Sequence, residues 1–151
     1  DLFRDIQKRL TTALRKHDLL RERVERLMTI PGVGEVTALT WALEIGDISR
    51  FSSASKAISY CGLCSAQKES AGKQIKGPIS KKRNKHLQTV LIEAAKLAPR
   101  WNPELHEIHE KELTKGNKNR ATLAVARRLV GYLMAVDRRE TGFVATMHEA
   151  A

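Results

Sequence analysis

The chain has 151 residues, which is enough for one domain that buries its own hydrophobic core without a disulfide or a metal. Its 27 lysine and arginine residues outnumber 17 acidic ones, which gives a formal net charge of +10 at pH 7. An excess of this size predicts a polyanionic partner, with nucleic acid as the first candidate. No apolar run approaches the ~20 residues of a membrane span, so we expect no membrane partner.

Asp1 to Met28 is predicted to form one long helix, because apolar residues recur at helical spacing with charged residues between them. A helix with a narrow apolar seam often pairs with a copy of itself as in a coiled coil, which would make the protein a homo-oligomer. The seam could equally pack on its own domain. The helical pattern is already under way at Asp1, so we expect the chain to be a fragment of a longer protein. The apolar positions are Leu2, Ile6, Leu10, Ala13, Leu14, Leu20, Val24 and Leu27.

Residues 28–46 have the pattern of a helix-hairpin-helix. Ile30-Pro-Gly-Val-Gly34 interrupts the helical spacing, and Glu35 to Ile45 resumes it. In such a hairpin, glycines let the backbone approach a phosphate at the start of the second helix. We therefore expect Gly32 and Gly34 to contact the sugar-phosphate backbone rather than the bases. The alternative is a tight turn between two helices that uses glycine for its backbone angles.

Ser52 or Ser53 is predicted to cap a helix from Ala54 to Tyr60. Cys61 and Cys64 follow as a single Cys-x-x-Cys pair. One such pair supplies half of a zinc site and no second pair follows, so we predict no metal site. Two unpaired cysteines suit a reducing, cytoplasmic compartment.

A basic, glycine-containing loop is predicted between Leu63 and Ile79, where apolar periodicity is weak and Gly72, Gly77 and Pro78 interrupt the chain. From this loop into the next segment, basic residues face a single acid, Glu69. Such a run is usually a solvated face, but its one-sided charge in a flexible loop favours a groove for phosphate groups. The residues expected to bind nucleic acid here are Lys73, Lys76, Lys81, Lys82, Arg83 and Lys85.

The rest of the chain is predicted to be helical, and the most apolar helix should form the centre of the core. No segment alternates at period two, so the fold class is mainly α. It comprises the long helix 1–28, a compact helical domain over 29–142 with the helix-hairpin-helix and the basic Gly-rich loop, and a frayed tail at 143–151. The predicted C-terminal helices are Ser80–Leu97, Pro103–Leu113 with Asn102 as cap, and Arg120–Val136.

Ser80 stands where the basic loop meets a predicted helix, and two roles are open for it. A serine in that place ordinarily caps the helix. Alternatively, the cations around it could hold a phosphodiester and stabilise the charge that develops when the hydroxyl attacks. A serine hydroxyl is a poor nucleophile unaided, and no histidine or aspartate stands beside it. His86, six residues further on, is not an obvious base from the sequence.

Several short motifs occur in a fixed order along the chain. They are Ile30-Pro-Gly-Val-Gly34, Ala38, Glu44-Ile-Gly-Asp47, Phe51, Tyr60-Cys-Gly-Leu63, Ser70-Ala-Gly72, Gly77-Pro-Ile-Ser-Lys81, Asn84, Leu87 and Glu93-Ala-Ala95. This ordered set resembles the C-terminal transposase domain of a family of bacterial insertion-sequence transposases, relatives of the Piv/MooV DNA invertases. The resemblance covers about Met28 to Val136. Arg83 departs from the family pattern, which usually has glycine there, and Gln88 stands where arginine is usual.

The resemblance implies a recombinase of a mobile element that is guided by a structured RNA and acts on DNA. Its serine nucleophile would correspond to Ser80, with Ser70 as the second choice. The family also carries a RuvC-like domain that binds Mg²⁺, and that domain has no counterpart in these residues. The fragment alone is therefore expected to hold no cofactor and to bind DNA without recombining it. Two other readings remain, a non-catalytic helix-hairpin-helix DNA-binding module and an RNA-binding domain.

Overall fold

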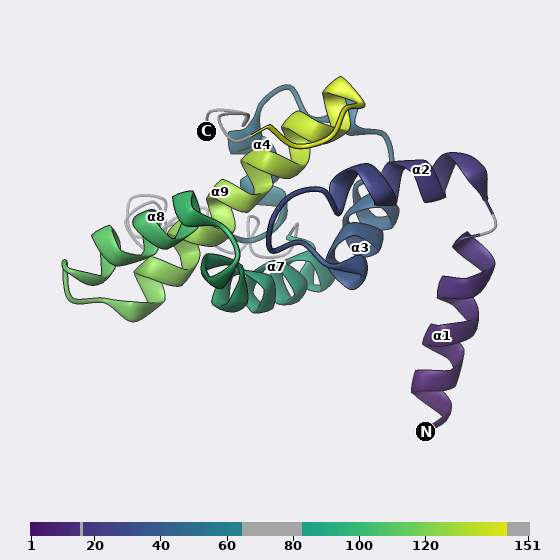
Figure 1. Ribbon diagram of the computed structural model, residues 1–151, viewed down its shortest axis with the longest axis horizontal. Helices are drawn as coiled ribbons and strands as arrows, with labels where there is room; N and C mark the ends of the chain where they lie inside the picture. Colours follow the sequence, from purple (N-terminus) through teal and green to yellow (C-terminus); the bar gives the residue numbers. More distant parts are fainter. Residues whose placement is uncertain (16, 65–82, 145–151) are drawn as a thin grey trace.

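The computed structural model describes residues 1–15, 17–64 and 83–144 (Figure 1). In these ranges the structure is helical and contains no strand, which confirms the mainly α class. Two short 3₁₀ helices, η1 (Ile48–Arg50) and η3 (Ala98–Arg100), connect α-helices. The α-helices are α1 (Leu2–Arg15), α2 (Asp18–Leu27), α3 (Glu35–Ile45), α4 (Ala54–Tyr60), α7 (Lys85–Leu97), α8 (Pro103–Leu113) and α9 (Lys118–Arg139).

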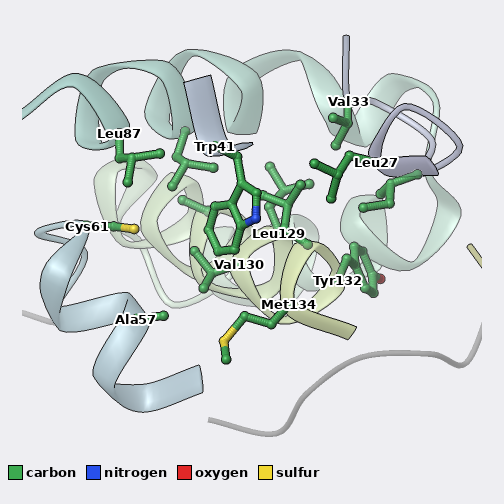
Figure 2. Close-up of a cluster of buried hydrophobic side chains, with 14 of the residues drawn as sticks. Leu27, Val33, Trp41, Ala57, Cys61, Leu87, Leu129, Val130, Tyr132 and Met134 are labelled. Atoms are coloured by element: carbon green, nitrogen blue, oxygen red, sulfur yellow. The ribbon is translucent and has the colours of Figure 1, made fainter. Parts of the chain in front are cut away.

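Helix α9 forms the centre of the core, as its apolar sequence predicts. Helices α2, α4, α7 and α8 all pack against it (Figure 1). Every residue from 129 to 137 is buried, so this part of the helix is enclosed on all sides. Figure 2 shows Leu129, Val130 and Met134 of α9 beside Trp41 of α3, with Ala57 of α4 close by.

The single helix expected over residues 1–28 is wrong, because the structure divides it into α1 and α2. His17, the N-cap of α2, has an extended backbone with φ −84° and ψ 108°. Helix α2 buries Val24 and Leu27 in the core, whereas α1 projects away from the body (Figure 1). Apolar spacing continues across the break, but the direction of α2 follows from its packing on α3 and α9.

A buried ion pair fixes α2 and α3 on α9. Arg23 donates from Nε and Nη2 to the two carboxylate oxygens of Asp137 at 2.8 and 2.7 Å. Trp41 of α3 donates its indole N–H to the same carboxylate at 3.0 Å. The side chain of Asp137 is 3% exposed, so its charge depends on these donors in place of water.

Several helix ends match their local sequence signals. The Ser53 side chain caps α4 by accepting from the N–H of Lys56, and Asn102 caps α8 with Pro103 in the first turn.

The predicted frayed tail begins at residue 143, but Phe143 is held in place by two contacts. Its N–H donates to Oγ1 of Thr29 at 2.8 Å, and its ring meets Tyr132 edge to face.

Candidate nucleic-acid interface

Most of the predicted site lies outside the described residues. This holds for both serine candidates and for the basic loop, namely Ser70, Lys73, Lys76, Ser80, Lys81 and Lys82. The structure describes the remaining predicted contacts, which are Gly32, Gly34, Arg83 and Lys85. Arg83 and Lys85 are both exposed.

Gly32 is required by packing. It lies in the turn between α2 and α3 with φ +97°, and a Cβ atom built there would lie 2.6 Å from Cβ and 2.8 Å from Cα of Ala98 in η3. Ala98 is fully buried, so the side of Gly32 on which a Cβ atom would stand faces the protein. This packing by itself explains a glycine at position 32. A contact of the Gly32 backbone with phosphate stays a prediction.

Gly34 differs from Gly32 both in its backbone angles and in the space around its Cβ position. It is the N-cap of α3 with φ −95° and ψ −177°, and nothing lies within 4 Å of a Cβ built on it. The N-terminal N–H groups of a helix attract anions, although Glu35 places an acid in this first turn. A phosphate contact in the predicted helix-hairpin-helix thus stays a prediction for Gly34.

The described residues on either side of segment 65–82 are held together at one place. The N–H of Asn84 donates to the carbonyl of Tyr60 at 2.6 Å, and Nε2 of Gln88 donates to the carbonyl of Gly62 at 2.9 Å. Arg127 of α9 donates to the carbonyl of Leu63 at 3.3 Å. We call these joined ends, Tyr60–Leu63 and Arg83–Gln88, the segment base. It is anchored on α4, α7 and α9.

The N-cap of α7 is Asn84, not Ser80. Its side-chain oxygen accepts from the N–H of Leu87 at 3.0 Å, and the helix begins at Lys85. The predicted helix from Ser80 to Leu97 is therefore described from Lys85 on. Capping of α7, the structural role first considered for Ser80, is performed by another residue.

A carboxylate and an imidazole meet at the segment base. His86 Nδ1 lies 2.7 Å from Oε1 of Glu44 on α3. Asn84 Nδ2 donates to the other carboxylate oxygen, Oε2, at 3.0 Å, and to the hydroxyl of Tyr60 at 3.2 Å. The hydrogen bond from Asn84, and then the one from His86, hold the pKa of Glu44 below its usual value, so this carboxylate is ionised at neutral pH.

This pair was not predicted from the sequence. Glu44 and His86 are 42 positions apart, and only the packing of α3 on α7 brings them together. A histidine that follows a helix cap by two positions carries no signal of its own, because a lone surface histidine is common. The pairing could have been suspected only once the two helices were known to be neighbours.

The two cysteines are unpaired and differ in their surroundings. Cys61 is buried in the core (Figure 2), and burial raises the pKa of its thiol to about 12. Cys64 Sγ lies 3.4 Å from the hydroxyl oxygen of Ser59.

Across the described ranges, no three His, Cys, Asp or Glu side chains form a group that could hold a metal ion. Within those ranges, no helix combines the length and the apolar character needed to cross a membrane.

Comparisons with known proteins agree on one family. The chain is 29% identical over 134 residues to the transposase for insertion sequence element IS1328 of Yersinia enterocolitica, covering 86% of this chain and 40% of the relative. It is 27% identical over 137 residues to a probable family 20 transposase of Pseudomonas aeruginosa, covering 88% of this chain and 40% of that protein. The transposase for IS1111A of Coxiella burnetii is 37% identical over 75 residues, covering 50% of this chain and 21% of that protein.

The chain thus spans about two-fifths or less of the length of these curated relatives. No solved structure matches it. The model of the family described as "Transposase IS116/IS110/IS902 family" matches residues 24–110, from α2 through the segment base into α8. Since this match covers more than half of the chain, the protein belongs to the IS116/IS110/IS902 transposase family.

Proposed function

We propose that the chain is the C-terminal domain of a DNA transposase that acts as a site-specific recombinase and binds the DNA backbone. The observation that carries this proposal is the family match over residues 24–110. The net charge of +10 supports a polyanionic partner. The exposed Arg83 and Lys85 at the segment base extend the basic run of segment 65–82.

Ser80 is the proposed nucleophile of this recombinase, with Ser70 as the second candidate. Its motif position supports this role, as does the assignment of the α7 cap to Asn84. Lys73, Lys76, Lys81 and Lys82 are proposed to hold phosphate groups, which favours backbone contacts and binding that weakens as salt rises.

The complete enzyme is proposed to include further parts. The family resemblance predicts a guide RNA and a RuvC-like domain that binds Mg²⁺. The described residues do not fit a Mg²⁺ site, because they contain no group of three suitable side chains. No step of the reaction is therefore assigned to the metal within this chain.

Self-association through α1 is a further part of the proposal. Leu2, Phe3 and Ile6 on this helix are 76%, 74% and 55% exposed. A projecting helix with an uncovered apolar face gains stability by packing on a partner, and a second copy would supply an identical face.

The second candidate function is a non-catalytic DNA-binding module. It is favoured by the turn between α2 and α3, where Gly34 leaves the start of α3 open. In this alternative both serines are incidental, and DNA binding would survive the loss of either hydroxyl.

The test uses the longer protein to which this chain belongs, with the RNA that purifies with it and Mg²⁺. The probe is a labelled supercoiled plasmid that carries the ends of the encoding element. Wild type, Ser80→Ala and Ser70→Ala are compared for an SDS-resistant protein–DNA adduct, and DNA binding is measured in parallel. We expect Ser80→Ala to lose the adduct and to keep its affinity for the plasmid. An adduct that survives this change would reject Ser80 as nucleophile, and no adduct in wild type would favour the non-catalytic module.

A further inference from the structure

We propose that Trp101 and Arg100 form a binding site for an unpaired nucleotide, in which a base stacks on the indole and the guanidinium holds the adjacent phosphate. The inference rests on the proposed binding of nucleic acid, and it adds a site made of residues outside segment 65–82. All of its structural grounds lie in the described residues of α7, η3 and α8.

The first ground is the exposure of Trp101. The chain has two tryptophans, and the other one, Trp41, is fully buried with its indole N–H bonded to Asp137. Trp101 is 69% exposed, and no described residue makes a hydrogen bond or a ring contact with its indole. A large ring left in water gains free energy when another flat or apolar group covers it.

The second ground is the fixed backbone that carries this ring. The N–H groups of Trp101 and Asn102 both donate to the carbonyl of Ala98 at 3.0 Å. The Asn102 side chain caps α8 and also donates to the carbonyl of Pro31 at 3.3 Å. Because Ala98 and Asn102 are both buried, the turn is held on the core. A ring presented in this way loses little conformational entropy when a ligand stacks on it.

The third ground is the hollow beside the ring. Trp101 borders a space of about 710 Å³ between the end of α7 and the start of α8. Sites of about 300–1,000 Å³ hold small organic ligands, so the hollow has room for a nucleotide. The charged and titratable residues that line it are Lys96, Arg100, His106, His109 and Glu110.

The fourth ground is the charge in this hollow. Arg100 is exposed, and no described residue pairs with its guanidinium. Lys96 Nζ lies 3.2 Å from Oε1 of Glu93, but an ion pair as exposed as this one is readily exchanged for another. Among the described lining residues Glu110 is the one acid, and its carboxylate lies 3.7 Å from Nδ1 of His109. A phosphate group can therefore bind Arg100 beside the indole.

The geometry selects an unpaired nucleotide over a base pair. In a duplex, the neighbouring base pairs cover both faces of each base, so the indole cannot reach them. An unpaired base exposes its faces, and stacking on an aromatic ring tolerates every base. The site is therefore expected to bind single strands with little sequence preference. DNA and RNA share this chemistry, and the experiment below distinguishes them.

A protein partner is the competing occupant of this surface. Trp101 also borders a second hollow of about 590 Å³ between α3 and α7, where the lining is mainly apolar and includes Val36 and Leu97. The first hollow differs, because it carries Arg100 and Lys96 in a chain with a net charge of +10. That charge favours a polyanion. A protein docked on Trp101 would give this residue no role in binding a short single strand.

The experiment measures binding of the 151-residue chain to three fluorescently labelled probes by anisotropy. The probes are oligothymidylate of about 12 nucleotides, oligouridylate of the same length, and a DNA duplex of the same length. The variants are Trp101→Ala, Trp101→Phe, Arg100→Gln and, as a matched control, Leu43→Ala, which removes another exposed apolar side chain on α3. Thermal unfolding is measured for each variant.

We expect Trp101→Ala to weaken single-strand binding about fivefold or more, with duplex affinity within about twofold of wild type. Trp101→Phe keeps a ring for stacking and should stay within about threefold of wild type. Arg100→Gln should lower the salt slope of single-strand binding by about 0.7, and Leu43→Ala should match wild type. The larger loss in Trp101→Ala, on oligothymidylate or on oligouridylate, identifies the strand as DNA or RNA.

Tryptophan emission gives a second measurement on the wild-type chain. A stacked base should quench the emission of Trp101, so an unlabelled single strand should lower the signal and a duplex should not. In Trp101→Phe the remaining emission comes from the buried Trp41 and should not respond.

Wild-type affinity of Trp101→Ala for both single strands would overturn the site while leaving duplex binding, and thus the proposed function, intact. An equal loss on single strands and duplex would also overturn it, and an unchanged salt slope in Arg100→Gln would overturn the phosphate contact. No binding of any probe by wild type would reject the proposed nucleic-acid binding, and this inference with it. If Trp101→Ala fails to fold, the wild-type emission decides, because absence of quenching by a bound single strand refutes stacking on Trp101.

Discussion

Gly32→Ala should destabilise the fold, and the size of the effect follows from two features of the turn between α2 and α3. The new Cβ would lie 2.6 Å from Cβ and 2.8 Å from Cα of Ala98, closer than side-chain carbons approach one another. Relieving that overlap in a packed core costs about 1–3 kcal/mol. Placing a side chain at φ +97° adds roughly 1–2 kcal/mol. Together the two terms give about 2–5 kcal/mol.

The assay is urea denaturation of the chain followed by circular dichroism, with thermal unfolding as a second measure. For a chain of this size, a loss of about 3 kcal/mol lowers Tm by roughly 10 °C. Gly34→Ser is the matched control, because Gly34 has an ordinary φ of −95° and open space around its Cβ position. Serine is also a favourable N-cap, so this variant should be as stable as wild type or slightly more stable.

DNA binding measured on the same two variants separates packing from ligand contact. If Gly32 served phosphate approach, Gly32→Ala would fold normally and bind poorly. A Gly32→Ala protein with wild-type stability would refute the packing argument, whatever its affinity. Gly34→Val adds bulk at the start of α3. If this variant is as stable as wild type and binds DNA more weakly, the predicted phosphate contact at Gly34 is supported.

Four other outcomes are expected. Asp137→Ala leaves the partly buried Arg23 guanidinium and the buried Trp41 indole without their acceptor and should cost about 3–5 kcal/mol in urea denaturation. A loss below about 1 kcal/mol would show that the ion pair is dispensable. The pKa of Glu44 is lowered in the fold, so its contribution to stability is present above its unfolded pKa of about 4.5 and is lost as pH falls through the lower folded value. The difference in unfolding free energy between wild type and Glu44→Gln should therefore shrink in acid. A difference that is constant with pH would contradict this. Ile6→Asp should halve the mass seen by sedimentation if α1 joins two copies, and a monomeric wild type would reject that pairing. Removal of the charges of Lys81 and Lys82 together should weaken DNA binding and lower its salt slope by about 1 per lost phosphate contact, whereas an unchanged slope would place these lysines away from DNA.

Local signals in the chain were sufficient for most helices. The asparagine before Pro103, the serine before Ala54 and the apolar run of α9 each specify an element through contacts within a few residues, so propensity and capping predict them. The family could also be inferred from ordered motifs, because their residues and spacing are written in the sequence itself.

The positions of the turns, and the residues that pack against them, are determined by contacts with distant parts of the chain. The break near His17 has no strong local marker, and α2 takes its direction from burying Val24 and Leu27. The packing that requires glycine at position 32 comes from Ala98, which is far along the chain and fills the space beside it.

The contact between Glu44 and His86 shows the same division most clearly. Glu44 and His86 are ordinary surface residue types in the sequence, and their types and spacing predict no contact between them. The packing of α3 on α7 and the cap supplied by Asn84 bring the carboxylate and the imidazole within 2.7 Å. Helices form from contacts between near neighbours, so the sequence can predict them. A site built across helices forms from long-range packing, and only the tertiary structure reveals it.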